Sequence, residues 1–276
     1  MKRVFIMLFA LMVTGALFGQ SFRDIYEKSI HDNRKVDYPH LREADVGWSK
    51  KIWRVIDLRE RMNHPLFFPV RPTVDGRKNL MSIILEEIEE GRVEAYDVSD
   101  LNVSVTYEDI EISMGAGPRT IDVYDDVTGD VIGDTVVYAS IDDRIEDVKQ
   151  LMLHEEWFFD KRHSRLQVRI IAISPITVEL SPVSGRVERQ RLFWVMFDDL
   201  RDALASNEVF NDRNDANRLS FDDLFMQRRF NSIVYAESNA FDDRFISEYM
   251  VGRDAIVEAE RIENIIRNWE HDLWEY

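Results

Sequence analysis

The stretch from Arg42 to Pro69 constrains this chain more than any other part of it. Within it lie two tryptophans, two phenylalanines and six lysines or arginines. The same stretch has no nucleophile–base pair, no glycine-rich phosphate loop and no spacing typical of metal ligands. Aromatic side chains interleaved with charge, in the absence of catalytic motifs, are typical of surfaces that contact other proteins. We therefore expect this segment to contribute to a protein-contact surface.

The centre of this stretch predicts a β-strand. Ile52, Ile56 and Leu58 would share one face of that strand, whereas Trp53 and Val55 would share the other. The clustering of β-branched residues favours the strand, although an amphipathic helix fits the spacing nearly as well. Three prolines between positions 65 and 72 then force an extended segment.

The N-terminus predicts export. A short basic start, the apolar run Val4–Phe18 and a small residue at Gly19 are typical of a secretory signal peptide. The alternative is a retained anchor, but the run is too short to span a bilayer comfortably. The chain has no cysteine, so its core and its partners must hold it together without disulfides. We expect a signal peptide over residues 1–19, a leader or arm over 20–41, and a single α+β domain over 42–276.

The charge of the chain is strongly negative. Its formal net charge is −17, and it would be −19 once Lys2 and Arg3 had been removed with the signal peptide. Such a chain is a poor candidate for binding nucleic acid or anionic lipid. The bases are 27 arginines against 8 lysines, and arginine pairs bidentately with carboxylates and stacks on aromatic rings. The charge serves either solubility alone or specific ion-paired contacts, including contacts between copies of the chain.

The middle of the chain predicts alternating helices and strands. An amphipathic helix capped by Asp75 is expected over Asp75–Glu90, and a second helix should open with a capping box at Ser140 and run to about Phe159. A turn at positions 128–130 predicts that the two flanking segments pair as a hairpin. The expected strands are Ile121–Tyr124, Thr135–Tyr138, Leu166–Ile173, Ile176–Leu180 and Leu192–Phe197, and a helix is expected over Asp198–Ser206.

The last third of the chain predicts mainly helix. No proline follows Pro182, and one helix is expected to start at Ser220 and to continue through Val234. After Gly252, apolar residues recur at alternating spacings of four and three. These residues are Ala255, Ala259, Ile262, Ile266, Trp269 and Leu273. The resulting helix would pack either on its own domain or on a partner subunit. The predicted fold class is α+β, with a mixed sheet or sheets, amphipathic helices and a mostly helical C-terminal third from about residue 220.

The sequence contains no recognisable catalytic or metal-binding motif. His154-Glu155-Glu156 resembles the start of a zinc helix, but Phe158 stands where the second histidine should be. Adjacent Asp/Glu pairs are common, yet neighbouring side chains point apart on strands and helices, and several pairs lie at expected helix starts. The chain has no Gly-x-Ser-x-Gly, Gly-x-Gly-x-x-Gly or Walker motif. We expect no catalytic residue, metal or cofactor; the alternative is a periplasmic hydrolase or metal-binding protein that uses Asp/Glu pairs.

The aromatic stretch also resembles a known family. Arg42–Asp45, Trp48–Glu60 and Met62–Leu66 closely resemble the gliding motility protein GldN family, also called PorN. Leu85–Gly91 and Asn207–Asn211 support the same resemblance, which extends from about residue 37 to the C-terminus.

The resemblance implies a non-enzymatic, periplasmic component of the type IX secretion and gliding machinery. It implies a ring complex with an outer-membrane lipoprotein, GldK or PorK, and contact with the motor protein GldM or PorM. From the acidic charge and the short apolar run, we expect no nucleic-acid partner and no direct membrane span. Within the aromatic stretch, six residues are candidates for a protein–protein interface, and for Trp48, Trp53 and Phe67 the alternative is burial in the protein's own core. The six candidates are Trp48, Trp53, Arg54, Arg59, Phe67 and Phe68.

Overall fold

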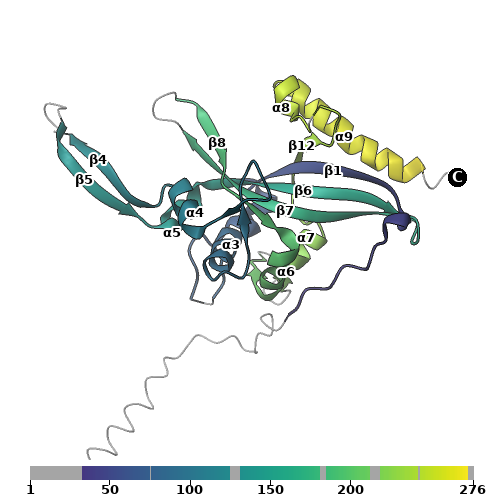
Figure 1. The fold of residues 1–276 in the computed structure, drawn as a ribbon, viewed down its shortest axis with the longest axis horizontal. Helices are drawn as coiled ribbons and strands as arrows, with labels where there is room; N and C mark the ends of the chain where they lie inside the picture. Colours follow the sequence, from purple (N-terminus) through teal and green to yellow (C-terminus); the bar gives the residue numbers. More distant parts are fainter. Residues whose placement is uncertain are drawn as a thin grey trace, which may run out of the picture.

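An eight-stranded antiparallel sheet forms the centre of the protein (Figure 1). The computed structural model describes residues 33–74, 76–124, 131–180, 185–211, 218–241 and 243–272. The strands run in the order β12-β1-β6-β7-β9-β2-β3, and β8 pairs with β7. Their bounds are β1 Val46–Asp57, β2 Ala95–Tyr96, β3 Ser104–Val105, β6 Val148–Asp160, β7 Arg165–Leu180, β8 Val187–Arg191, β9 Trp194–Met196 and β12 Ile233–Glu237.

Helices and two small ribbons complete the α+β fold. The α-helices are α2 His64–Phe67, α3 Leu80–Glu89, α4 Tyr107–Ser113, α5 Ile141–Arg144, α6 Phe197–Ser206, α7 Phe221–Met226, α8 Ile246–Tyr249 and α9 Arg253–Asp272. Single 3-10 turns are η2 Glu43–Asp45, η3 Arg61–Asn63 and η4 Ile145–Asp147. The ribbons pair β4 Gly117–Tyr124 with β5 Val131–Ala139, and β10 Glu208–Val209 with β11 Leu219–Ser220. The predicted α+β class is therefore confirmed.

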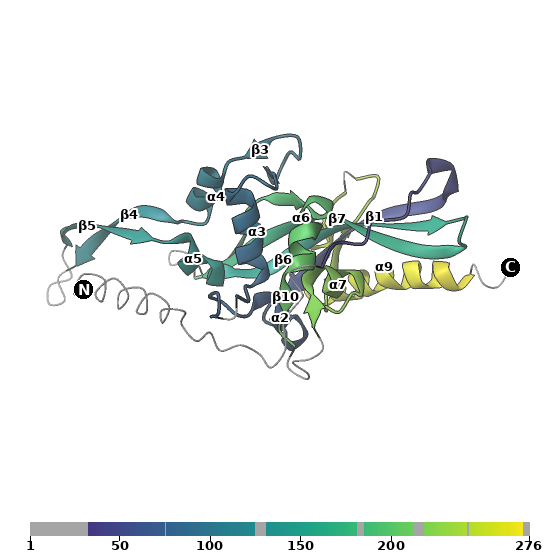
Figure 2. The same cartoon turned by 90° about the horizontal axis from the view of Figure 1, so that it is seen from below.

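Strand β1 confirms the alternation predicted for the aromatic stretch and extends it to Val46. Ile52 and Ile56 are fully buried on one face, whereas Trp53 and Val55 are half-buried on the other. The face that carries Ile52 and Ile56 contacts two hydrophobic clusters. Ile56 belongs to the larger cluster, with α3, α6 and α7, and Ile52 to a smaller cluster with α9. Figure 2 shows α3, α6 and α7 near the middle of the molecule and α9 beside the long strands towards one end.

Helix α3 is shorter than predicted. It begins at Leu80, and Asn79 caps it by accepting a hydrogen bond of 2.7 Å from the backbone N–H of Ser82. The expected cap, Asp75, lies outside the described residues, and Gly76 adopts a left-handed φ of 80° four residues before the helix. The predicted apolar face is correct, because Ile83, Ile84 and their neighbours are buried in the larger cluster.

The helix predicted from Ser140 to about Phe159 is wrong. The Ser140 side chain does cap a helix, but that helix, α5, ends at Arg144 and strand β6 follows. Strand β6 pairs along its length with β1 on one side and β7 on the other. Buried apolar residues lie on both faces of β6, with Leu151 and Leu153 in the larger cluster and Met152 on the opposite face, so an apparent helical period can arise by chance.

The two strands predicted on either side of Pro175 form one strand, β7. The predicted strand Leu192–Phe197 is reduced to Trp194–Met196, and the predicted helix after it is confirmed as α6. The pairing of Ile121–Tyr124 with the segment Thr135–Tyr138 is also confirmed in β4 and β5, although the turn between them lies outside the described residues.

A mostly helical final third is not confirmed, since strands β8 to β12 occur beyond residue 185. The helix predicted from Ser220 through Val234 ends at Met226, and Arg228 adopts a left-handed φ of 52° just after it. The chain then returns as β12 on the edge of β1. Arg228 is held in place by an ion pair of 2.8 Å with Glu155 of β6, so a tertiary contact stabilises the helix end.

The helix predicted after Gly252 is confirmed as α9, and it packs on its own domain. Ala259, Ile262 and Ile266 are buried against Ile52 of β1 and Val234 of β12. The apolar face of α9 thus covers the protein's own sheet over the described length of the helix. Leu273 lies outside the described residues.

Part of the predicted leader is also described, and it lies against α6 and α7. The ring of Tyr38 lies between two arginines, with ring-to-guanidinium distances of 4.3 Å to Arg201 and 4.8 Å to Arg169. Arg201 is fully buried, pairs with Asp222 at 2.9 Å and donates a hydrogen bond of 2.7 Å to the backbone carbonyl of Val36. Residues 33–41 are thus held by charged contacts, and residues 1–32 lie outside the description.

Candidate interaction surfaces

The aromatic stretch is divided by β1 between two faces of the sheet. Trp48 lies on the face covered by α9 and stacks on Trp269, with ring centroids 4.6 Å apart. Trp53 lies on the opposite face and stacks on His154, with centroids 4.7 Å apart and planes at 7°. Trp194 meets the far side of the same histidine edge-on at 6.5 Å. Because alternate residues of a strand point to opposite faces, the two tryptophans cannot form one patch.

Arg54 lies inside the protein, in an ionic cluster between the two hydrophobic clusters. Its side chain is 5% exposed and pairs at 3.2 Å with Glu155, which is fully buried. Arg228 pairs with the same carboxylate, and Glu263 of α9 lies 3.7 Å from Arg54. Burial lowers the pKa of Arg54, whereas the charge of Glu155 raises it. Removing one member of such a buried pair costs about 3–5 kcal/mol, which indicates that Arg54 serves the fold.

Arg59, Phe67 and Phe68 are brought together at the end of β1. They line a groove of about 360 Å³ together with Leu58, His64 and Lys149. Phe68 is 46% exposed, and its ring meets that of Phe67 edge-on at 4.9 Å. The ammonium of Lys149 lies 5.1 Å from the centre of the Phe67 ring. This groove combines exposed aromatic surface with basic groups.

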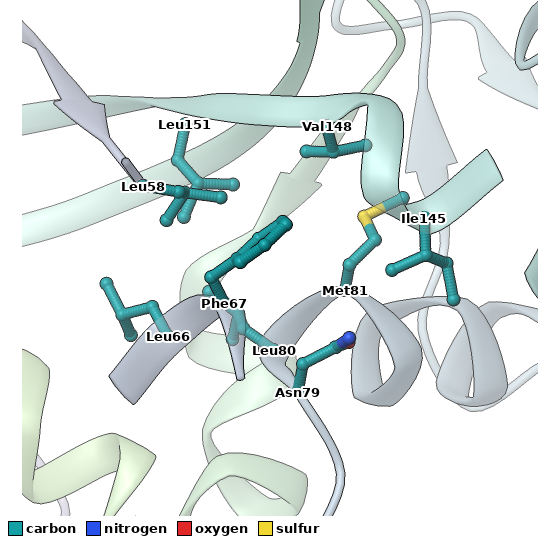
Figure 3. Close-up of a pocket in the computed structure, with 9 residues that line it drawn as sticks. All are labelled: Leu58, Leu66, Phe67, Asn79, Leu80, Met81, Ile145, Val148 and Leu151. Atoms are coloured by element: carbon teal, nitrogen blue, oxygen red, sulfur yellow. The ribbon is translucent and has the colours of Figure 1, made fainter. Parts of the chain in front are cut away.

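Phe67 also belongs to the core beneath the groove. Figure 3 shows its ring pointing into the space between Leu58, Val148 and Met81. The same side chain lines a cavity of about 10 Å³ whose other walls are almost entirely apolar. A cavity of this size and chemistry gives a water molecule too few polar partners, so we treat it as a packing defect of the core. Phe67 therefore joins the core to the groove floor.

Arg59 is held at the groove by a neighbouring carboxylate. Its Nε donates a hydrogen bond of 2.8 Å to Oδ1 of Asp57, and its backbone N–H donates to the same oxygen at 3.0 Å. The side-chain bonds from Arg59 are the largest cause that lowers the pKa of Asp57 to about 2, with Gln150 adding a further hydrogen bond. The guanidinium is thus positioned before any partner arrives, which reduces the entropy lost on binding.

Of the six groove residues, the sequence analysis named three as contact candidates, expected Leu58 only on a strand face, and missed His64 and Lys149. His64 lay within the aromatic stretch but was not singled out. Lys149 comes from β6 and reaches the groove because Leu58 donates a backbone hydrogen bond of 2.8 Å to its carbonyl. This pairing depends on β6 being a strand, and the sequence predicted a helix there.

The described residues offer no metal site. Within them, no three His, Cys, Asp or Glu side chains gather closely enough to hold a metal ion. None of the helices that the structure describes is long and apolar enough to cross a membrane.

Comparison with known proteins gives one family. The model of the family described as gliding motility associated protein GldN matches residues 41–275. No curated protein matches the chain.

Proposed function

This chain belongs to the gliding motility associated protein GldN family, and from that membership we propose that it is a structural, non-enzymatic subunit of the gliding and type IX secretion machinery. Membership in the family makes the chain a component of that machinery.

In this proposal the protein is exported to the periplasm by a signal peptide over residues 1–19. There it assembles with further copies of itself and with a GldK- or PorK-like outer-membrane lipoprotein into a ring. The ring contacts a GldM- or PorM-like motor protein. The described fold suits such a role, because hydrophobic clusters and a buried ionic cluster hold its sheet and helices together.

The groove at the end of β1 carries the proposal. Arg59 is 57% exposed at its side chain, Phe68 is 46% exposed, and both lie in the segment where the family resemblance is densest. Arginine and aromatic residues contribute most of the binding energy in protein interfaces. A groove of about 360 Å³ between them accepts one or two side chains of a partner protein.

Alanine substitution at the groove tests the proposal. Phe68→Ala and Arg59→Ala should each reduce co-purification with the lipoprotein partner about tenfold, which is the loss typical of interface hot spots. Met62→Ala is the matched control, because Met62 is 62% exposed in the same segment but does not line the groove. Unchanged recovery of the lipoprotein by folded groove variants would exclude the groove as its contact surface.

The contact role predicted for Trp48 and Trp53 stays a prediction. Both side chains are half-buried and each stacks on a ring of its own domain. The same co-purification assay applied to Trp48→Ala and Trp53→Ala separates a contact role from a packing role, provided that unfolding is measured beside it.

A further inference from the structure

The ribbon formed by β4 and β5 stands apart from the rest of the molecule. Among the described strands, β4 and β5 pair with each other and with no other strand. Both views show the ribbon projecting from the body beyond α4 and α5 (Figures 1 and 2). A two-stranded ribbon is at best marginally stable by itself in water. We therefore expect another protein surface to bind the β4–β5 ribbon.

The residue pattern of the ribbon supports a cover on both faces. Ile121 and Val123 occupy one set of alternating positions, whereas Val136 and Tyr138 pair opposite residues of the other set. A ribbon that is solvated on both sides has no reason to carry apolar residues in both sets. In addition, Asp122 pairs directly opposite Asp134, and like charges placed opposite each other destabilise a ribbon unless a positive charge is near.

The charge of the ribbon is complementary to that of a second exposed strand. Residues 117–139 contain five aspartates and one arginine. Strand β8, in contrast, contains Arg189 and Arg191 against Glu188, within a chain of net charge −17. Among the described strands, β8 pairs with β7 alone, so its outer edge carries backbone donors and acceptors that a further strand can bind. Val187 on this strand is 56% exposed and adds apolar surface.

We propose that the β4–β5 ribbon of one copy docks along the outer edge of β8 of the next copy. The two elements lie in separate projections of one molecule in Figure 1, so one neighbouring copy can bind the ribbon while another neighbouring copy binds β8. Pairing between different surfaces of identical chains is head-to-tail, and such contacts close into a ring when the rotation between copies allows it. The inference rests on the proposed self-assembly and names the surfaces that carry it.

Cross-linking tests the pairing cleanly, because the chain has no cysteine of its own. Full-length Thr135→Cys and Gln190→Cys variants, one of them tagged for separation by size, are mixed and treated with a bismaleimide. We expect a cross-linked heterodimer. A mixture of Thr135→Cys with Val251→Cys should give none, since Val251 is 83% exposed but lies on the loop before α9.

Charge reversal adds specificity to this test. Adding Arg189→Glu to the Gln190→Cys variant should lower the heterodimer yield about tenfold, because it places like charges across the contact. Adding Asp134→Lys to the Thr135→Cys variant should restore the yield. Thermal unfolding of each variant checks that the fold is intact.

Three outcomes would overturn the inference. They are the absence of the heterodimer, a yield indifferent to charge reversal, and loss of lipoprotein binding by Asp134→Lys without any cross-link between copies. The last outcome would assign the ribbon to another protein. If rings still form with the lipoprotein while the heterodimer is absent, the proposed function stands and this inference fails; if no assembly forms at all, the proposed function itself fails.

Discussion

His154 shows how a single residue can limit the stability of this protein. Its ring stacks on Trp53 and meets Trp194 edge-on, and among the described residues its Nε2 has no hydrogen-bond partner although it is buried. Burial, and then the nearby charge of Lys51, lowers the pKa of His154 from 6.5 to about 4. The folded protein therefore holds this histidine neutral at a pH where the unfolded chain would protonate it.

This residue predicts a loss of stability in mild acid. Because the folded pKa is the lower one, stability is complete above about pH 6.5 and falls as the pH decreases toward 4. The loss should reach about 2 kcal/mol, and His154→Phe should remove it. Urea unfolding at pH 7 and at pH 4.5 measures the difference. An unchanged acid dependence in the phenylalanine variant would assign the effect to other groups.

At the scale of elements, α9 offers the sharpest prediction. Ile262 is 1% exposed and packs against β1 and β12, so Ile262→Ala should cost about 3 kcal/mol of unfolding free energy. Ile265→Ala on the same helix is the matched control, because Ile265 is 40% exposed and should change stability by less than about 0.5 kcal/mol. If Ile262→Ala instead left the unfolding free energy unchanged and weakened assembly, the apolar face of α9 would be a subunit contact.

The elements that the sequence predicted correctly have signals contained within them. Strand β1 alternates, α9 keeps one apolar face along its length, and in the sequence a turn signal separates the apolar runs that pair as β4 and β5. The failures at β6 and after α7 have a different cause, because there the partner of the segment decides its structure. Glu155 of β6 and Arg228 after α7 bind each other across 73 residues, and local sequence carries no trace of that pairing.

The same distinction applies to the candidate groove: residues close in sequence could be predicted, and residues brought in by strand pairing could not. Arg59, Phe67 and Phe68 are close in sequence, and η3 and α2 directly after β1 bring them together. Lys149 enters through the pairing of β1 with β6, which a mistaken helix concealed. The burial of Arg54 was also beyond the sequence, because an arginine is normally exposed unless charged partners from other elements surround it.

For the whole molecule, the strongly negative net charge opposes assembly, because identical subunits repel one another. Subunits of charge −19, which is the charge without the proposed signal peptide, repel one another over distances up to about the Debye length. This length is about 30 Å at 0.01 M salt and about 10 Å at 0.1 M, and at larger separations the repulsion is screened. The proposed contacts between the acidic ribbon and basic β8 act at close range and weaken at higher salt, where the Debye length is about 3 Å at 1 M. As the salt concentration rises, it should first screen the repulsion between subunits and then, at higher concentration, screen the attraction between the ribbon and β8.

We therefore expect the yield of assembled particles with the lipoprotein partner to rise from about 0.01 M to 0.1 M salt and to fall again toward 1 M. Sedimentation of the mixed proteins at these three salt concentrations measures the yield, and sucrose at matched osmolarity is the control for effects other than charge. In the Arg189→Glu variant, the yield of assembled particles should not decrease between 0.1 M and 1 M salt, because the attraction that salt weakens is already absent from this variant. A yield that stays flat across all three concentrations would show that contacts other than charge pairs hold the assembly together.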